Sequence, residues 1–214
     1  MSDLQQQTIP DDIMTTCAHL SIMGRLAYFV MCIETYLVHV HPDRDWRLLA
    51  KGIWLYSSMP LAWWLLLYEE LKPDTVLHLD EESLNKHYRW RVQKYFTWDE
   101  YQSIVRQYSG ITDGHPDDPD DVLSAILRVP FDLVSILADD YDDPLPSFIE
   151  IRVRRMLDES LHQISKLLQI LFSNHIEFPD VHQLDFLTIK DDKVWGERFD
   201  GPSLSILLPK ETVS

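Results

Sequence analysis

Residues 147–171, SFIEIRVRRMLDESLHQISKLLQIL, decide the fold, because apolar side chains recur in them at intervals of three and four residues. This period places the apolar side chains on one face of an α-helix. Ser147 and Glu150 open the stretch with the spacing of a capping box, in which each side chain accepts a backbone N–H. We therefore expect a long amphipathic helix that buries one face. The stripe consists of Val153, Leu157, Leu161, Ile164, Leu168 and Leu171.

Helical signals also fill the chain upstream of this stretch. Capping residues, apolar periodicity and proline stops predict five more helical segments. They cover residues 11–40, 43–59 with a continuation past Pro60 to 71, 81–96, 97–109, and 118–138 with a kink at Pro130. Thr97 and Glu100 form a second capping box, and Asp118-Pro119 reads as an N-cap followed by the first helical residue. Residues 75–79 are expected to be a short strand or an extended link.

The period changes after Pro179. The pattern predicts two strands joined by a four-residue loop, at residues 186–189 and 194–199. A last strand is possible at residues 204–208. The predicted fold is therefore mainly α, a bundle of about six to seven helices with a small C-terminal β-hairpin. We expect one domain over residues 1–214, helical over 11–176, with the hairpin appended at 184–208.

Three features predict a cytoplasmic protein. Residues 1–12 lack the basic start and apolar stretch of a signal peptide. Residues 52–68 carry no charge, but Pro60 interrupts them, which favours a pair of buried helices over a membrane span. If Cys17 and Cys32 share one helix, about 22 Å of helical rise separates them, too far for a disulfide. A reducing compartment suits such free thiols.

The chain is strongly acidic, with 35 Asp and Glu against 19 Lys and Arg and a formal net charge of −16. Such a charge repels nucleic acid and anionic lipid, and it favours basic partners, cations or simple solvation. The acidity is concentrated in residues 113–143, the acidic belt, where ten Asp accompany a single basic residue, Arg128. No nucleic-acid or membrane partner is therefore expected.

The acidic belt contains two clusters with different local explanations. The first cluster precedes a predicted helix, where carboxylates cap N–H groups and favour the helix dipole. The second follows the same helix, where the dipole disfavours anions, so solvent, a cation or a basic partner must compensate. Both clusters are candidate partner-binding residues. The first is Asp117, Asp118, Asp120 and Asp121, and the second is Asp139, Asp140, Asp142 and Asp143.

Both clusters also match the pattern Asp-Asp-x-x-Asp. In this respect they resemble the aspartate-rich motif of prenyl-diphosphate and terpene synthases, all-helical enzymes that hold Mg²⁺ on it. The resemblance implies a metal site at Asp139, Asp140 and Asp143, with Asp117, Asp118 and Asp121 as a further set. This chain departs from the family by its prolines, its short length and the closeness of the two motifs. A simpler carboxylate site for Mg²⁺ or Ca²⁺ is the alternative.

Other chemistries find little support. The chain has six Gly and lacks a P-loop, a dinucleotide-binding fingerprint, a nucleophile elbow and an HExxH motif. The segment 82–98 interleaves cations with aromatic residues, a composition that also suits nucleic acid. Given the net charge, we expect instead a helix whose aromatic side chains pack inward and whose cations face solvent or the acidic belt.

Taken together, these features predict an acidic cytoplasmic interaction protein that binds a basic protein partner. Immunity proteins, antitoxins and inhibitors share this profile of a small acidic domain without a catalytic motif. No cofactor is expected for such a protein. The alternative hypothesis is a metal-dependent all-helical enzyme, in which an Asp-rich site holds Mg²⁺ or Ca²⁺ and the ion acts as a Lewis acid.

Overall fold

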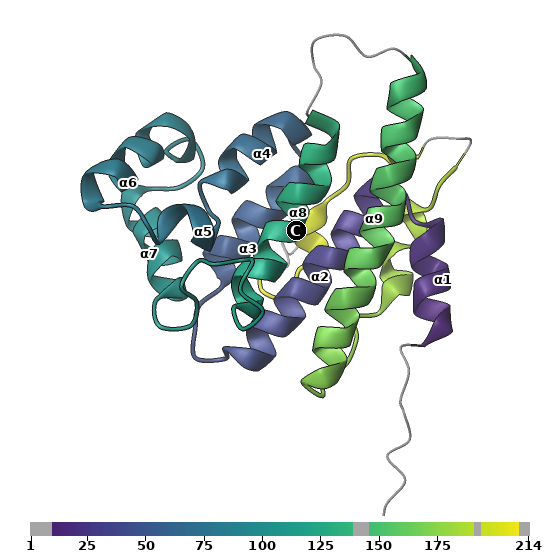
Figure 1. The fold of residues 1–214 in the computed structure, drawn as a ribbon, viewed down its shortest axis with the longest axis horizontal. Coiled ribbons are helices and arrows are strands. Elements are labelled where there is room, and N and C mark those ends of the chain that lie inside the picture. The colour runs from purple at the N-terminus through teal and green to yellow at the C-terminus, as the bar shows by residue number, and fades with distance from the viewer. Residues whose placement is uncertain (1–9, 139–145, 191–193, 210–214) are drawn as a thin grey trace, which may run out of the picture.

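The chain folds into a bundle of helices (Figure 1). The structure is a computed structural model, and it describes residues 10–138, 146–190 and 194–209. These residues contain nine α-helices and a π-helical turn, so the mainly α class is confirmed and the predicted number of helices is too low. The α-helices are α1 (Asp11–His19), α2 (Ile22–Val40), α3 (Arg47–Trp54), α4 (Leu61–Glu69), α5 (Pro73–Val76), α6 (Glu81–His87), α7 (Trp98–Tyr108), α8 (Val122–Ala138) and α9 (Pro146–Ser173). The π-helical turn is η2 (Tyr88–Val92), and the 3-10 turns are η1 (Leu55–Ser57), η3 (Val181–Leu187) and η4 (Gly201–Leu204).

α2 is the central helix of the bundle. Of its 19 residues, 16 are buried, on all of its faces. A helix of this kind is stable only when other elements surround it. α9 packs along α2, and α8 packs against both of them (Figure 1). The amphipathic stripe predicted from the sequence thus has its partner, since Ile164, Leu168 and Leu171 of α9 are buried.

The predicted single helix over residues 11–40 is wrong, because the chain breaks at Leu20. Leu20 is extended, with φ −70° and ψ 144°, and the hydroxyl of Ser21 caps the first turn of α2. The buried guanidinium of Arg25 holds the break in place. Its Nε donates to the carbonyl of Leu20 at 3.0 Å, and its Nη2 donates to the carbonyl of Ala18 at 2.7 Å. The break turns α1 away from α2 and leaves backbone groups for other segments to pair.

The two cysteines consequently lie on different helices, Cys17 on α1 and Cys32 on α2, so the separation expected for a shared helix does not apply. Both thiols are free and buried. Burial raises the pKa of Cys17 to about 12 and raises that of Cys32 well above its usual value. Both thiols are therefore protonated core groups and poor nucleophiles.

The predicted C-terminal β-hairpin at 184–208 is also wrong in the described part of the chain, which contains no strand. The segment begins in the 3-10 turn η3, and Thr188 forms only an isolated antiparallel bridge with Leu20. Residues 191–193 of the predicted loop lie outside the described residues.

The physical reason is that this segment pairs with the start of α2. The first N–H groups of a helix have no acceptor within the helix. Here the carbonyls that a hairpin would use for its own ladder accept them, at 2.9–3.1 Å. The N–H groups of Ser21, Ile22 and Met23 donate to the carbonyls of Leu187, Val194 and Trp195, respectively.

A buried carboxylate on α2, that of Glu34, holds the last described residues. It accepts hydrogen bonds from Nε1 of Trp54 at 2.7 Å, from Oγ of Ser205 at 2.6 Å and from the N–H of Ile206 at 2.9 Å. Burial raises the pKa of Glu34, although these three hydrogen bonds favour its ionised form. The predicted strand at 204–208 is therefore replaced by η4 and a turn that is bonded to Glu34.

Capping residues and prolines predicted the bounds of some of the other helices correctly and those of others incorrectly. Both hydrogen bonds of the capping box at Thr97 and Glu100 are present, and the helix that they open, α7, ends at Tyr108 as expected. Pro60 separates α3 and η1 from α4, and the side chains of Trp54 and Trp64 are buried as expected for a pair of core helices. The prediction is only partly right for α4, because Trp63 and Leu66 lie on an exposed face of this helix. None of the helices in the described ranges is both long and apolar enough to cross a membrane.

The predicted strand or extended link at residues 75–79 is wrong, because Pro73 begins a short helix there, α5. Proline suits the first turn of a helix, where its missing N–H has no acceptor in any case.

We expect the substitution Glu34→Ala to lower the free energy of unfolding by about 2–4 kcal/mol. The substitution leaves three donors without an acceptor, and each unsatisfied donor costs about 1–3 kcal/mol when it is buried. This loss is partly offset, because the cost of burying the carboxylate disappears. Thermal or urea unfolding measures the change. The control is Glu177→Ala at an exposed carboxylate, which should change stability by less than about 0.5 kcal/mol. Equal effects of the two substitutions would contradict the assigned role of Glu34.

Candidate functional site

The first acidic cluster lies in the loop between α7 and α8, residues 110–121, which we call the acidic loop. The loop contains five Asp and no Lys or Arg. One carboxylate, that of Asp121, fixes it from the inside. It accepts from the hydroxyl of Thr112 at 2.6 Å, from the N–H of His115 at 3.0 Å and from the N–H of Ser124 at 3.1 Å.

Asp121 also sets the start of α8. The prediction that Asp118 caps this helix and Pro119 begins it is wrong, because α8 begins at Val122. The carboxylate of Asp121 accepts the N–H of Ser124, the third residue of the helix, as an N-cap does. The preceding residues form two turns closed by backbone hydrogen bonds, from Asp118 to His115 and from Asp121 to Asp118.

The protonation of Asp121 follows from these contacts. Burial alone raises its pKa, but the hydrogen bonds from Thr112, His115 and Ser124 outweigh burial, so the pKa lies below its usual value. Asp121 is therefore ionised at neutral pH and acts as an internal anchor of the loop. Of the four predicted binding residues in this cluster, it is the one that is not fully exposed and that bonds to several parts of the loop.

The other carboxylates of the loop face solvent. Asp113, Asp117, Asp118 and Asp120 are exposed. Asp113, Asp118 and Asp120 line a hollow of about 310 Å³ together with His115. Asp117 points away toward Arg128, with its Oδ1 3.4 Å from Nη1. Because Asp117 is 96% exposed, this ion pair contributes little.

A second contact holds the middle of the loop. Gly114 has φ 74°, and a Cβ at this position would lie 2.9 Å from the carbonyl oxygen of Pro73. The imidazole of His78 lies beside it, with its ring centroid 5.1 Å from that of His115. The sequence did not reveal this histidine pair, because the two residues are far apart in the chain and only the packing of the loop against α5 brings them together.

The second acidic cluster, Asp139, Asp140, Asp142 and Asp143, lies outside the described residues. This also holds for the predicted metal ligands Asp139, Asp140 and Asp143. Within the described ranges, no group of three or more His, Cys, Asp or Glu side chains is placed to hold a metal ion. The further set of Asp117, Asp118 and Asp121 is thus not arranged as a metal site, because Asp117 and Asp121 point in different directions.

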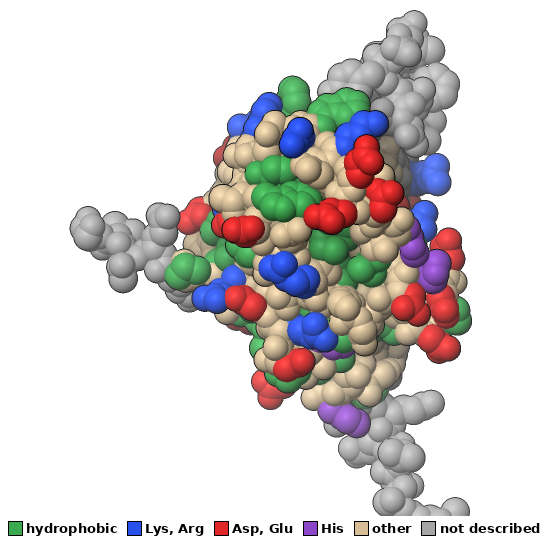
Figure 2. Space-filling view, turned by 90° about the vertical axis from the view of Figure 1, so that its left-hand side faces the viewer, with side chains coloured by type: hydrophobic (Ala, Val, Ile, Leu, Met, Phe, Trp, Pro, Cys, Tyr) green, Lys and Arg blue, Asp and Glu red, His purple; other side chains and the backbone are tan. Residues whose placement is uncertain are grey.

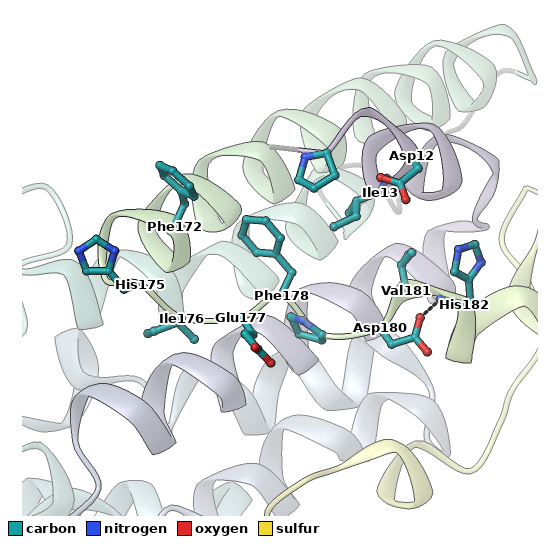
Figure 3. A pocket seen from close by; sticks show the side chains of 12 residues that line it. Asp12, Ile13, Phe172, His175, Ile176, Glu177, Phe178, Asp180, Val181 and His182 are labelled. Atoms are coloured by element: carbon teal, nitrogen blue, oxygen red, sulfur yellow. Dashed lines mark hydrogen bonds between the residues drawn. The ribbon is translucent and has the colours of Figure 1, made fainter. Parts of the chain in front are cut away.

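Another hollow, of about 740 Å³, lies between α1 and the end of α9. Figure 3 shows the apolar side chains of Phe172, Ile176 and Phe178 along it. Its two histidines, His175 and His182, lie at opposite ends of the view (Figure 3). The two histidines therefore do not converge on one point.

The prediction for the basic segment is partly wrong. Residues 81–92 form α6 and the π-helical turn η2, and residues 93–96 are a turn in place of the predicted end of the helix. Tyr88 packs inward against Trp98, with ring centroids 5.2 Å apart. Trp90 points outward instead and is 71% exposed. The cations Lys86, Arg89 and Lys94 are exposed as predicted, whereas Arg91 pairs with Glu70 of the neighbouring segment and not with the acidic belt.

Comparisons with known proteins add no further constraint. The sequence matches no protein-family model, and no curated protein or solved structure is significantly similar to it. The candidate site therefore rests on its own geometry: a fixed loop that carries exposed carboxylates around a hollow.

We expect Asp121→Ala to lower the free energy of unfolding by about 1–2 kcal/mol, the usual effect of removing an N-cap. It should also loosen the acidic loop, which amide hydrogen exchange of His115 and Ser124 reports. The matched control is Asp120→Ala, which removes an exposed carboxylate one residue away. If Asp120→Ala destabilises the protein as much as Asp121→Ala, the anchor has been assigned to the wrong residue.

Proposed function

We propose that this protein is an interaction module that binds a basic protein through the acidic loop, as immunity proteins, antitoxins and inhibitors bind their targets. The observation that carries the proposal is the hollow lined by Asp113, Asp118 and Asp120. Their carboxylates are exposed, and in the described part of the chain none of them pairs with a cation.

The chemistry of the loop favours a Lys or Arg side chain as its ligand. Three carboxylates around an open hollow supply acceptors in several directions, which suits the ammonium or guanidinium donors of such a side chain. The histidine His115 at the rim adds a ring against which an alkyl stem can pack. The whole-chain charge of −16 would then accelerate association with a basic protein and disfavour acidic ones.

The fixed conformation of the loop also supports the proposal. Asp121 holds the loop from its C-terminal end, and Gly114 packs the middle of the loop against Pro73. A binding loop that is ordered before the partner arrives loses less conformational entropy on binding. The metal-dependent alternative lacks comparable support in the described residues, where no set of three ligands is formed.

The test is co-purification of the native partner from the source organism at low and high ionic strength. The bait is either the wild-type protein or the triple variant Asp113→Asn, Asp118→Asn, Asp120→Asn. We expect wild type to retain a basic protein at about 50 mM salt, and the variant to bind the recovered protein at least about tenfold more weakly.

The control bait is Asp43→Asn, Asp158→Asn, Asp185→Asn, which removes the same charge from exposed positions elsewhere on the surface. It should retain the partner with nearly unchanged affinity. If both triple variants lose the partner equally, net charge rather than the acidic loop governs binding. If wild type retains no basic protein at low salt, the proposed function is wrong.

A further inference from the structure

A second surface has the opposite chemistry to the acidic loop. Figure 2 shows the side of the molecule on which α6 lies, where basic and hydrophobic side chains gather among acidic ones. We call the residues of α4, α6, η2 and the turn after η2 that carry this chemistry the basic–aromatic patch. It consists of Trp63, Leu66, Lys86, Arg89, Trp90, Arg91 and Lys94.

The aromatic part of the patch is unusually exposed. Trp63 is 60% exposed, Leu66 is 43% exposed and Trp90 is 71% exposed. Trp63 and Leu66 are three residues apart on α4 and so share one face of that helix. Tryptophan is enriched among the residues that dominate binding energy at interfaces, as is arginine. Large apolar side chains that gather on one surface mark an interaction site more often than isolated ones do.

Each tryptophan has a cation beside it. The guanidinium carbon of Arg91 lies 5.0 Å from the centroid of the Trp90 ring, and Nζ of Lys94 lies 5.7 Å from that of Trp63. The second contact joins the turn after η2 to α4, so Trp63 lies next to the cations of residues 86–94. Residues 86–94 carry four Lys and Arg and no acid, in a chain whose net charge is −16.

The patch is built on a fixed framework. Glu70, which is buried at the end of α4, accepts from Nη1 of Arg91 at 2.9 Å and from Nδ1 of His87 at 2.5 Å. The N–H of Gln93 donates to the carbonyl of Tyr88 five residues earlier, which is the hydrogen bond of a π-helical turn. This turn directs Tyr88 inward and leaves Trp90 outside. Turns of this kind occur frequently at functional sites.

The cations of the patch are available to a ligand. Arg91 is partly neutralised by Glu70, but in the described part of the chain Lys86, Arg89 and Lys94 form no ion pair. Lys86, Arg89 and Trp90 also line a hollow of about 580 Å³ at the surface. A ligand of the patch must therefore combine negative charge with apolar groups that cover the tryptophans.

We propose that the basic–aromatic patch binds a short acidic segment of a partner protein, one that interleaves Asp or Glu with apolar or aromatic residues. Its carboxylates would face Lys86, Arg89 and Lys94, while its apolar side chains would cover Trp63 and Trp90. The inference goes beyond the proposed function, because it assigns a second partner of opposite charge to a different surface.

Charge complementarity favours a short segment over an extended polyanion. Asp80, Glu81 and Glu82 at the start of α6 are exposed beside the patch, and Figure 2 shows acidic side chains on the same face. A nucleic-acid strand or an anionic membrane extends beyond the cations and meets these carboxylates. Glu82 lines the same hollow as Lys86, one turn away on α6. At physiological salt, screening acts over about 8 Å, so a short segment centred on Arg89 and Lys94 avoids most of the repulsion from the acids at the start of α6.

The test uses a fluorescein-labelled peptide of about a dozen residues that alternates Glu with Leu and Tyr, a length that spans such a patch. Fluorescence anisotropy is measured at about 50 mM salt, with an oligothymidylate of similar length and phosphatidylserine vesicles as competing probes. We expect saturable binding of the peptide to the full chain. Trp63→Ala, Trp90→Ala and Arg89→Glu should each weaken it about tenfold.

Two controls match these substitutions. Phe186→Ala removes an exposed aromatic ring elsewhere, and Lys166→Glu reverses an exposed charge on α9. Neither should alter peptide binding. The triple Asn variant of the acidic loop should bind the peptide as tightly as wild type, so that failure of the proposed function is distinguished from failure of this inference. Circular dichroism verifies that each variant is folded, as expected for substitutions at exposed positions.

Several outcomes would overturn the inference. They are no saturable peptide binding up to about 1 mM, equal binding by wild type and the patch variants, or tighter binding of the oligonucleotide or the vesicles than of the peptide. Salt-sensitive self-association of wild type that Trp90→Ala abolishes would show instead that a second copy of the chain covers the patch.

Discussion

Two buried charges on the central helix dictate where much of the chain must lie. Arg25 and Glu34 are both on α2, and neither has an ion-pair partner of the opposite charge among the described residues. A buried charge costs several kcal/mol unless hydrogen bonds replace its water. For Arg25, the acceptors come from the break after α1 and from α9, through the carbonyl of Leu157 at 2.6 Å and the hydroxyl of Ser160 at 3.2 Å. For Glu34, the donors come from α3 and the C-terminal segment. Segments distant in sequence therefore meet at α2.

The two surfaces assigned to partners are constructed in the same way. In each, an internal carboxylate fixes a segment, and the neighbouring side chains on the outside carry the binding chemistry. Asp121 fixes the acidic loop, and Glu70 fixes η2 against α4. Such anchoring orders both surfaces before a partner arrives, which reduces the entropy lost on binding. We thus propose a basic partner for the acidic loop and an acidic partner for the basic–aromatic patch.

Local patterns in the sequence predicted the helices well and the connections between them poorly. The stripe in α9 and the capping box at Thr97 depend on residues three and four apart, so the sequence contains all the information. The break at Leu20 depends on Arg25 and on backbone groups near the end of the chain. The apparent hairpin failed for the same reason, since its segments satisfy the start of α2.

The candidate site shows the same division. Composition located the acidic cluster, but it did not distinguish the anchor Asp121 from the exposed Asp118 and Asp120. The hydrogen bonds that Asp121 accepts from Thr112, His115 and Ser124 make that distinction. Similarly, the sequence shows the alternation of cations and aromatic residues in 82–98. The outward direction of Trp90 depends on a π-helical turn, which no local sequence pattern predicted.

The central claim is that cationic and anionic partners are bound by two separate surfaces. Backbone amide chemical-shift mapping tests it most directly, with ¹⁵N-labelled protein titrated first with a Lys-rich peptide and then with the Glu-rich one. The account predicts that the Lys-rich peptide shifts the amides of residues 111–121, and that the Glu-rich peptide shifts those of residues 86–94 and of α4 around Trp63. Shifts spread over the whole surface, or the same residues responding to both peptides, would contradict it.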